Sequence, residues 1–553
     1  MYRIILIITT ALTLSFIVGC KQEAIVVAEQ WSETEIVFTS DKQVKNPYTD
    51  IEFWVEFTGP SGEKLSRPGF WDGGNTFRVR FANPLDKGEW QWISFASDTT
   101  DIGVHGKTGK LLSALYSGNN PLIKNGLLCM SPGKRNVVHA NGKSFLMIGD
   151  TPWALPWRGT TESVTEYAKK RHSQGFNTAL LMSLQPDREA MGPRNRTDEG
   201  AFDVAFEDLK DGHINNPNVA YFQYFDSLRN ILIDHGIVPV FQPVFHGFGW
   251  KGMKVLGWDM DAKEYARYCR YLVARYGAKP AMWLVGADAD GRNTGVKVGG
   301  EEIEKWDAYK QPTGLHYSPF DDRTPEWLKD VGGKYEPHMN RSFQDAVWLD
   351  FQWCQTGHSG EHLFHKVGLM YNNIPVKAVA NGEPTYEGIS RPENGSGWWQ
   401  GHEAWSQFLS GGTMGVVYGA GSLWNWKLSA NEPGWAGWAN SNVSWKEALQ
   451  LPGANYVGYL AKALEGLKIT DIEKHPELAG GNLCLARPGE LYLVYLPEGG
   501  EVTLSGLPKD LVFRWFNPIE GAFFAQGNTT AVQKFSAEKG KPAVLIVSTL
   551  LIK

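Results

Sequence analysis

The chain has 553 residues, of which 42% are hydrophobic and 21% are charged, and its formal net charge is -6. This composition is that of a globular protein and excludes a largely disordered chain. Because a single hydrophobic core stops growing near ~250–300 residues, the length predicts two or three domains. No basic stripe is visible along the sequence, so nucleic acid is not an expected partner.

Aromatic residues are unusually numerous, with 23 Trp, 20 Tyr and 27 Phe. A Trp ring offers a broad apolar face with one polar group, and that suits stacking against sugar rings. Secreted β-rich proteins also use aromatic residues in their cores. The composition therefore allows two interpretations, a carbohydrate-binding surface or an aromatic interior.

The first twenty residues have the features of an export signal. Arg3 gives a short positive start, and residues 4–18 form an apolar run that is shorter than the ~20 residues of a comfortable membrane span. Ile17-Val18-Gly19-Cys20 resembles a lipoprotein cleavage box, in which the Cys is lipidated. We expect a protein exported to the bacterial cell envelope, at the outer membrane or in the periplasm, that touches the membrane only through a lipid on Cys20. An ordinary cleaved signal that happens to end in Cys is the alternative.

Residues 28–120 show the alternation of strands. The expected strands cover residues 35–39, 51–58, 76–81 and 89–97, and they are separated by turn clusters such as Gly59-Pro60-Ser61-Gly62. Short strands at this spacing are typical of a β-sandwich, so we predict an N-terminal β-sandwich domain.

Residues 125–468 change to an alternation of apolar runs and helical periodicity. Helical patterns at 161–174, 219–235 and 261–276 each precede a glycine that would end the helix. Eight strand–helix units over this length predict a (β/α)8 barrel. A doubly wound open sheet is the rival, disfavoured because no Gly-rich phosphate turn follows the first strand. The expected strands are 145–149, 177–183, 237–243, 281–286, 314–318, 348–355, 376–380 and 415–418.

Residues 472–553 are strand-like again. Runs at 491–496, 501–504, 511–517 and 543–548 are separated by turns and predict a small C-terminal β-sandwich. The whole chain is therefore expected to be a central barrel flanked by two β-domains.

Metal-ligand motifs are weak in this sequence, and no cofactor is expected. His358 and His362 have helical spacing, but no His-Glu-x-x-His motif is present. No Gly-x-Ser-x-Gly turn of a serine esterase is found either. The spacing of the four cysteines after the signal fits neither a metal site nor a compact disulfide framework, and we interpret them as buried small residues, with a disulfide left open. They are Cys129, Cys269, Cys354 and Cys484.

Two carboxyl groups at predicted strand ends suit glycosidic bond cleavage. Active sites of such barrels lie at the carboxyl ends of the strands. Asp288 follows the fourth strand and Glu383 the seventh, so the two could face each other across the barrel mouth. One carboxyl group would protonate the leaving oxygen and the other would attack the anomeric carbon or activate water. Each alone could instead cap a helix or pair with an Arg, and Asp290 and Glu387 are competitors for the two roles.

Other polar and aromatic residues gather at the same strand ends and are candidates for substrate binding. A structural role is the alternative for each: a helix cap for Asp150, hydrogen-bonded histidines, and core positions for the tryptophans, Trp426 among them. The candidates are Asp150, Trp153, His246, Trp250, His316, Tyr317, Tyr386, Glu387, Tyr418 and Trp424.

Four motifs together resemble the apiosidase-like glycoside hydrolases, barrel enzymes that act on plant cell-wall glycans. They are Gly149-Asp150-Thr151-Pro152-Trp153, Lys170-Arg171 with Gly175-Phe176-Asn177, the segment 283–288, and Gly382-Glu383-Pro384-Thr385-Tyr386-Glu387. The segments 54–57 and 68–73 resemble a small β-domain often fused ahead of such barrels. The segments 493–497 and 515–518 resemble the so-called collagen-binding domain, a module that usually accompanies glycosidases.

The resemblance implies a retaining mechanism with Asp288 as acid/base and Glu383 as nucleophile. The sequence departs from the family near the expected sugar pocket. The family's Gly-Gly-Asp reads Gly286-Ala287-Asp288, its Asp-Val-Arg is replaced near residues 401–405, and its two His after Tyr-Gly are replaced by Ala420 and Gly421. We therefore expect this protein to share the barrel fold and the reaction of the family, but not necessarily its specificity for apiose.

Three functions remain in view. The first is a glycoside hydrolase acting on plant or algal cell-wall polysaccharide or its oligosaccharides. The second is a surface glycan-binding lipoprotein whose barrel has lost catalysis, and a separation of the carboxyl groups well beyond ~10 Å would favour it. The third is a polysaccharide lyase or esterase, which is disfavoured because no Arg or Lys cluster for uronates is visible.

Overall fold

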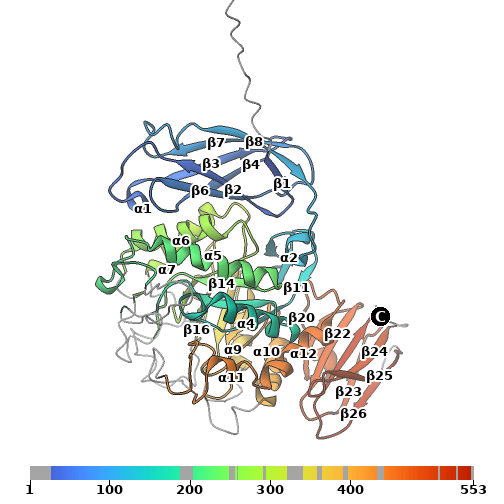
Figure 1. Cartoon of the computed structure of the whole chain (residues 1–553). Helices are drawn as coiled ribbons and strands as arrows, with labels where there is room; N and C mark the ends of the chain where they lie inside the picture. The colour runs from blue at the N-terminus through green and yellow to red at the C-terminus, as the bar shows by residue number, and fades with distance from the viewer. Residues whose placement is uncertain are drawn as a thin grey trace, which may run out of the picture.

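The structure is a computed structural model, and its described residues form a central barrel with a β-domain on either side (Figure 1). The description covers residues 26–186, 188, 204–247, 256–257, 260–289, 294–319, 340–357, 364–389, 397–432, 441–508, 511–530 and 533–549. Within this part of the chain, no helix combines the length and apolar character needed to cross a bilayer.

The N-terminal domain consists of two packed sheets, as the alternating pattern predicts. Aromatic and β-branched side chains that face inward, among them Phe57, Val79 and Trp90, fill the space between the sheets. The larger sheet has the order β1 (Val26–Glu29), β8 (Thr108–Ala114), β7 (Glu89–Ala96), β3 (Phe53–Thr58) and β4 (Lys64–Pro68). The smaller has the order β2 (Glu33–Thr39), β6 (Thr76–Ala82) and β5 (Phe70–Trp71), and the short helix α1 (Pro47–Asp50) follows β2.

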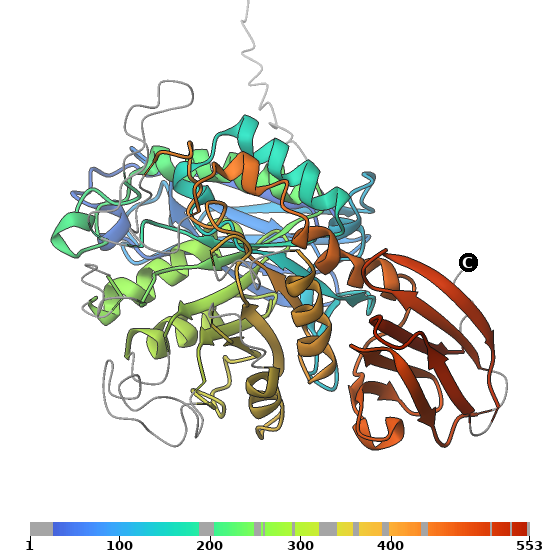
Figure 2. The ribbon, with the colours of Figure 1, turned by 90° about the horizontal axis from the view of Figure 1, so that it is seen from below.

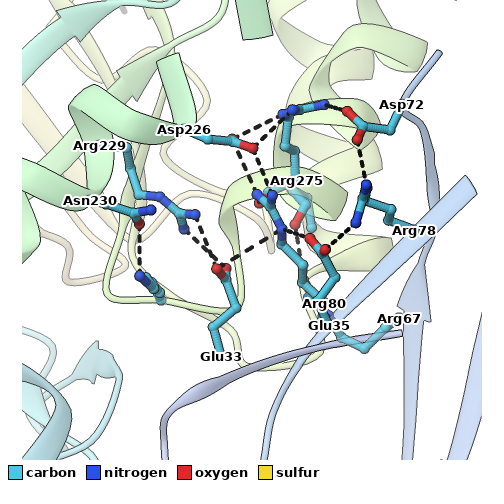
Figure 3. Close-up of polar contacts among 12 residues, drawn as sticks. Glu33, Glu35, Arg67, Asp72, Arg78, Arg80, Asp226, Arg229, Asn230 and Arg275 are labelled. Atoms are coloured by element: carbon cyan, nitrogen blue, oxygen red, sulfur yellow. Dashed lines mark hydrogen bonds and ion pairs between the residues drawn. The ribbon is translucent and has the colours of Figure 1, made fainter. Parts of the chain in front are cut away.

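The N-terminal domain is joined to the barrel by a largely buried network of ion pairs (Figure 3). Asp226 on a barrel helix lies 2.7 Å from the Arg80 guanidinium of β6 and 2.9 Å from that of Arg275 on the next helix. Arg275 also lies 2.9 Å from Asp72, which follows β5. Because the guanidinium groups are shared between carboxylates of both domains, the domain is fixed against these helices.

Eight parallel strands close into a barrel in chain order, which confirms the predicted fold class. All eight predicted strand positions carry a strand. The strands are β12 (Met147–Asp150), β13 (Thr178–Met182), β14 (Val238–Gln242), β15 (Met282–Ala287), β16 (Thr313–Tyr317), β17 (Phe351–Gln355), β18 (Ala378–Glu383) and β19 (Gly415–Tyr418).

Helices surround the barrel, and the predicted glycine stops agree with their ends. The short connections are α2 (Pro121–Lys124), α3 (Leu155–Arg158), η1 (Leu209–Asp211) and α11 (Trp445–Ala448). The longer helices are α4 (Thr161–Ser173), α5 (Val219–Asp234), α6 (Ala262–Tyr276), α7 (Thr294–Trp306), α9 (Phe364–Tyr371), α10 (Trp398–Leu409) and α12 (Gly453–Leu464).

Three barrel strands have a boundary that differs from the sequence prediction by two residues or more. Phe145 pairs with Val137 in a separate sheet of β9 (Leu128–Met130), β10 (Val137–His139) and β11 (Ser144–Phe145), so the first barrel strand begins only at Met147. Trp348 precedes β17 and packs against Gly300 of α7. The seventh strand continues beyond the predicted end at residue 380 and includes Glu383 as its last residue.

The C-terminal domain packs a six-stranded sheet against the barrel, and Figure 2 shows it to one side of the barrel helices. Both faces of its central strands are buried, one by the barrel and one by a two-stranded sheet, so those strands read as continuous apolar runs. The six strands are β20 (Glu473–Lys474), β21 (Leu483–Arg487), β22 (Leu491–Leu496), β27 (Ala543–Ser548), β24 (Val512–Asn517) and β25 (Ala522–Asn528). The two-stranded sheet is β23 (Gly500–Leu504) with β26 (Gln533–Ala537), and η3 (Pro476–Ala479) lies near them.

Most of the largest aromatic side chains are core residues. The tryptophans among the largest fully buried side chains are Trp90, Trp283, Trp353, Trp405 and Trp426. Of Cys129, Cys269, Cys354 and Cys484, three are buried and Cys129 is half-buried, and all four are unpaired thiols. The aromatic composition therefore reflects the interior of the protein to a large extent.

Candidate active site

Three predicted site residues meet at the carboxyl ends of three barrel strands. One carboxylate oxygen of Asp288, one ring nitrogen of His316 and one carboxylate oxygen of Glu383 lie within 4.8 Å of one another. Asp288 is half-buried, whereas His316 and Glu383 are buried. The two predicted catalytic carboxyl groups therefore face each other, as the strand-end argument expects.

A bulge in β18 turns Glu383 toward the barrel interior. Cys354 of β17 pairs with Asn381, but the next residue, Gln355, pairs with Glu383, so Gly382 is an extra residue on β18. Successive strand residues point to opposite faces, and a one-residue shift therefore moves Glu383 to the face that it shares with Gln355. The extra residue must be small, because a Cβ on Gly382 would lie 2.8 Å from the Cβ of Trp353.

A second bulge lies in β15, directly before Asp288. Leu284 pairs with Gly314 and Ala287 pairs with His316, so β15 uses three steps where β16 uses two. Asp288 itself has φ 52°, in the left-handed region that Asp tolerates better than most side chains. The barrel strands that carry the two carboxyl groups thus both depart from regular geometry where the side chain must be aimed.

Gly247 leaves the space that the Asp288 carboxyl group occupies. A Cβ on Gly247 would lie 2.1 Å from Asp288 Oδ2, well inside any allowed contact. The segment after β14 is held to β15 by the His246 N–H, which donates to the Ala287 carbonyl at 3.2 Å. The carboxyl group of Asp288 therefore lies against the bare backbone of the neighbouring strand end.

Three side chains hold the Glu383 carboxylate. Gln355 donates from Nε2 to Glu383 Oε2 at 2.9 Å, and His316 Nε2 lies 3.3 Å from the same oxygen. The Tyr386 hydroxyl donates to Glu383, and burial together with that carboxylate raises the pKa of Tyr386 well above its usual value. Trp153 in turn donates from Nε1 to the Tyr386 oxygen at 2.8 Å. Donors that converge on a carboxylate stabilise its ionised form and fix its orientation.

Other predicted residues lie at or near this cluster. The Trp153 ring lies 6.2 Å from the His316 ring, centroid to centroid. Trp424 belongs to the same buried group inside the barrel as Trp153 and Tyr386, and its carbonyl accepts the Ala154 N–H at 3.0 Å. Trp153 and Tyr386 therefore lie beside the carboxylate pair, and Trp424 lies next to the segment that carries Trp153.

Asp150 and Tyr317 have structural settings away from this pair. Asp150 is fully buried and accepts from Arg171 Nε at 2.5 Å and from the Thr151 N–H at 2.8 Å. The Tyr317 hydroxyl accepts the Ser342 N–H at 3.0 Å, on the face of β16 opposite to His316. Strand alternation explains the second case, because His316 and Tyr317 are neighbours and cannot both face inward.

Glu387 and Tyr418 are brought together, but away from Glu383. The Tyr418 hydroxyl donates to Glu387 Oε2 at 2.6 Å. The carboxylate also accepts the N–H of Gly397 before α10 and the N–H of Gly453 at the start of α12, at 2.8 and 2.9 Å. Burial raises the pKa of Glu387, which these donors partly offset. This carboxylate thus ties two helix N-termini to the barrel.

His246 and Trp426 are both enclosed by other parts of the barrel. The His246 ring is fully buried, with Gly257 against it and the Tyr265 ring 6.0 Å away. Trp426 stacks on Trp445 at 4.8 Å. The predicted residues Trp250, Asp290, His358 and His362 lie outside the described residues.

Two residues near Glu383 are missing from the sequence prediction. Gln355 ends a barrel strand, the same signal that identified the other candidates. Glu403 of α10 is buried and accepts the Thr385 N–H at 3.2 Å, two residues after Glu383. Sequence reasoning marked residues 401–405 only as a departure from the family, because nothing local shows that a helix side chain reaches a strand end.

The trio of Asp288, His316 and Glu383 is also the only group of three potential metal ligands found at such spacing among the described residues. Nitrogen and carboxylate oxygen ligands suit Zn²⁺, which binds them at ~2.0–2.2 Å. The same trio has the two carboxyl groups that glycosidic cleavage requires without any metal.

Comparison with known proteins agrees with the barrel fold. The model of the family described as apiosidase-like, catalytic domain, matches residues 131–471, and that of a domain of unknown function, DUF5060, matches residues 27–97. A search of curated proteins gave no match.

Similar solved structures have low sequence identity and share the fold. A Bacteroides vulgatus protein with a provisional glycoside hydrolase assignment is 17% identical with a TM-score of 0.69, over 95% of this chain and 99% of its own. A glycoside hydrolase family 5 protein from Bacteroides vulgatus is 22% identical with a TM-score of 0.61, over 77% and 94%. A structure described as a glycoside hydrolase is 20% identical with a TM-score of 0.61, over 77% and 98%. Together with the barrel and its paired carboxyl groups, the family match over most of the chain shows that this protein belongs to the apiosidase-like family.

Proposed function

We propose that this protein is a retaining glycoside hydrolase acting on plant or algal cell-wall polysaccharide or its oligosaccharides. The observation that carries the proposal is the proximity of Asp288 and Glu383, of which one oxygen each lies within 4.8 Å of the other. Retaining glycosidases hold their two carboxyl groups ~5–5.5 Å apart, whereas inverting enzymes need ~6.5–9.5 Å to admit a water molecule. The short separation favours the retaining mechanism.

In the first step Glu383 attacks the anomeric carbon, and the bond from that carbon to the glycosidic oxygen breaks. Asp288 gives its proton to the departing oxygen, so a glycosyl ester of Glu383 and an alcohol result. In the second step the Asp288 carboxylate takes a proton from water while the water oxygen attacks the same carbon. The ester bond breaks, Glu383 leaves as a carboxylate, and Asp288 is protonated again.

The surrounding side chains support the division of roles. Gln355, His316 and Tyr386 contact Glu383, which suits a nucleophile that must be ionised and oriented. Asp288 is half-buried at the end of β15, where a proton can be exchanged with substrate and water. The Trp153 ring lies 6.2 Å from the His316 ring, so an aromatic side chain lies beside the pair for contact with a sugar ring.

The proposed substrate class and cellular location are supported by family membership and by the sequence. Family membership supports a cell-wall glycan, and the changes at residues 401–405, Ala420 and Gly421 argue for a sugar other than apiose. Residues 1–20 support export and attachment by a lipid on Cys20, which would place the barrel at the cell envelope.

The experiment is hydrolysis of a panel of plant and algal polysaccharides and 4-nitrophenyl glycosides, with proton NMR of the first product anomer. We expect net retention of configuration with wild-type protein. Glu383→Ala should lose at least about 10³-fold in kcat, with partial recovery by azide as a glycosyl azide. Glu501→Gln, an exposed carboxylate of the C-terminal domain, is the matched control.

Two outcomes would replace the proposal. Near wild-type activity of Glu383→Ala would remove the nucleophile assignment. Binding of a glycan by wild-type protein without any cleavage across the panel would leave a surface glycan-binding lipoprotein.

A further inference from the structure

Glu403 is a buried carboxylate on α10 that bonds to the ends of two barrel strands. Its Oε2 accepts the Thr385 N–H at 3.2 Å, and its Oε1 accepts the Thr356 hydroxyl at 3.3 Å and Gln407 Nε2 at 3.0 Å. Only 1% of the residue is exposed. A buried carboxylate is costly unless donors compensate it, and these contacts supply such donors.

The two threonines flank the residues that act at the site. Thr356 follows Gln355, the donor to Glu383, and Thr385 lies two residues after Glu383. The Thr356 N–H also donates to the Glu383 carbonyl at 3.3 Å. One carboxylate therefore fixes the backbone on both sides of the β17–β18 bulge.

Asn381 completes the connection from Glu403 to Glu383. Its Nδ2 donates to the Thr356 hydroxyl at 3.0 Å, and its Oδ1 accepts the Glu383 N–H at 3.2 Å. The Thr356 hydroxyl thus accepts from Asn381 while it donates to Glu403. Every residue in this series of hydrogen bonds is buried, so water cannot replace a lost partner without reorganisation of the surrounding structure.

The opposite side of α10 is held by the C-terminal domain. The His402 ring lies 2.7 Å from the Tyr495 hydroxyl, and the Trp405 ring lies 6.2 Å from the Tyr495 ring and 6.3 Å from that of Phe516. Glu403 and Gln407 are four residues apart and share the other side of the helix. One side of α10 is therefore held by the C-terminal domain, while Glu403 on the other side holds the ends of β17 and β18.

We propose that Glu403 is a positioning residue that holds Glu383 in the geometry for attack on the anomeric carbon. The inference rests on the proposed function and adds to it a residue that touches no substrate. Loss of its charge and acceptors would let the bulged end of β18 relax. A displacement of ~1 Å at a nucleophile can cost ~10²-fold in rate, while binding by the rest of the site is retained.

The test measures kcat and KM of Glu403→Gln on the 4-nitrophenyl glycoside that wild-type protein cleaves best. The glutamine keeps the size but places an N–H₂ group against one of the present donors. We expect kcat to fall about 10- to 100-fold with KM changed less than about 3-fold. Activity is counted per site labelled by the matching 2-fluoro dinitrophenyl glycoside, so unfolded protein does not contribute.

Glu264→Gln is the matched control. Glu264 is a similarly buried helical carboxylate on α6 that accepts the Ile214 N–H at 3.0 Å and contacts none of the site residues named above. We expect it to lower the melting temperature but to leave kcat per labelled site unchanged.

A second pair of variants keeps the proposal testable if Glu403→Gln does not fold. Thr356→Val should lower kcat in the same manner, whereas Thr356→Ser, which keeps the hydroxyl, should remain near wild type. A wild-type kcat per labelled site in both Glu403→Gln and Thr356→Val would overturn the positioning role. Absence of cleavage by wild-type protein would instead overturn the proposed function itself.

Discussion

Gln355 lies opposite Glu383 across the β17–β18 pair because Gly382 is an extra residue on β18, and Gln355 donates to the Glu383 carboxylate at 2.9 Å. In a regular ladder Glu383 would point to the helix layer, as Asn381 does, rather than into the barrel. The nucleophile proposed here therefore depends on a local defect in the sheet.

Gly247→Ala is expected to lower activity strongly with little loss of stability. The added Cβ would lie 2.1 Å from Asp288 Oδ2 and must displace that carboxyl group. We expect kcat/KM to fall by about 10²-fold, because the acid/base would leave its position near the leaving oxygen. The control is Gly295→Ala in α7, where the added Cβ meets Tyr265 only at 3.8 Å. Equal activities of the two variants would contradict the placement of Asp288.

Chelation with EDTA is expected to leave glycosidase activity unchanged, because the carboxylate chemistry requires no metal. Added Zn²⁺ should inhibit by binding Asp288, His316 and Glu383, whose ligand atoms lie within 4.8 Å. His316→Asn should raise the Zn²⁺ concentration for half-inhibition by about tenfold or more. Loss of activity in EDTA, with recovery on adding a divalent ion, would make the trio a catalytic metal site instead.

Arg275→Met is expected to destabilise the contact between the N-terminal domain and the barrel. The variant leaves the carboxylates of Asp72 and Asp226 without a shared buried partner. Removing one member of a buried ion-pair network costs ~3–5 kcal/mol, which urea unfolding should detect. Arg341→Met, which removes an exposed partner of Asp345, is the control and should change stability by less than about 1 kcal/mol. A similarly small effect of Arg275→Met would mean that the network is solvated.

The Asp226 carboxylate is expected to contribute stability that acid removes. Burial by itself raises the pKa of Asp226, but Arg275 and Arg80 outweigh it and lower this pKa to about 2. The stabilisation is therefore complete above the ordinary value of 3.8 and is lost as the pH falls toward 2. The gap in melting temperature between wild type and Asp226→Asn should narrow from pH 5 to pH 2.5. A gap that stays constant over this range would exclude the lowered pKa.

Asp350 is expected to have the opposite pH dependence. Burial raises the pKa of Asp350 to about 7, although the Thr313 N–H and Lys377 oppose the shift. The folded protein thus binds a proton that the unfolded chain has released, and stability falls as the pH rises from 4 through 7. Asp350→Asn keeps an acceptor for the Thr313 N–H and has no carboxyl group to titrate. The melting temperature of the variant relative to that of wild type should therefore rise by about 1–3 °C as the pH is raised from 5 to 8. The exposed Asp345→Asn variant should show no such change relative to wild type. A difference in melting temperature between Asp350→Asn and wild type that does not vary with pH would contradict the prediction.

The sequence by itself determined the barrel, the two β-domains and the two carboxyl groups at the ends of β15 and β18. These follow from local patterns: apolar runs alternate with helical periodicity, glycines end helices, and acidic residues follow strands. The same patterns could not separate Glu383 from Glu387, since both follow the seventh strand within a few residues.

Only the tertiary structure decided which of these residues meet. The bulge at Gly382 turns Glu383 inward, while the Glu387 carboxylate accepts hydrogen bonds from Tyr418 and from the N-termini of two helices. The Asp150 carboxylate is likewise paired with Arg171. Register shifts and partners that are distant in sequence leave no periodic signal, because they depend on how strands and helices pack against one another rather than on the order of residues along one of them.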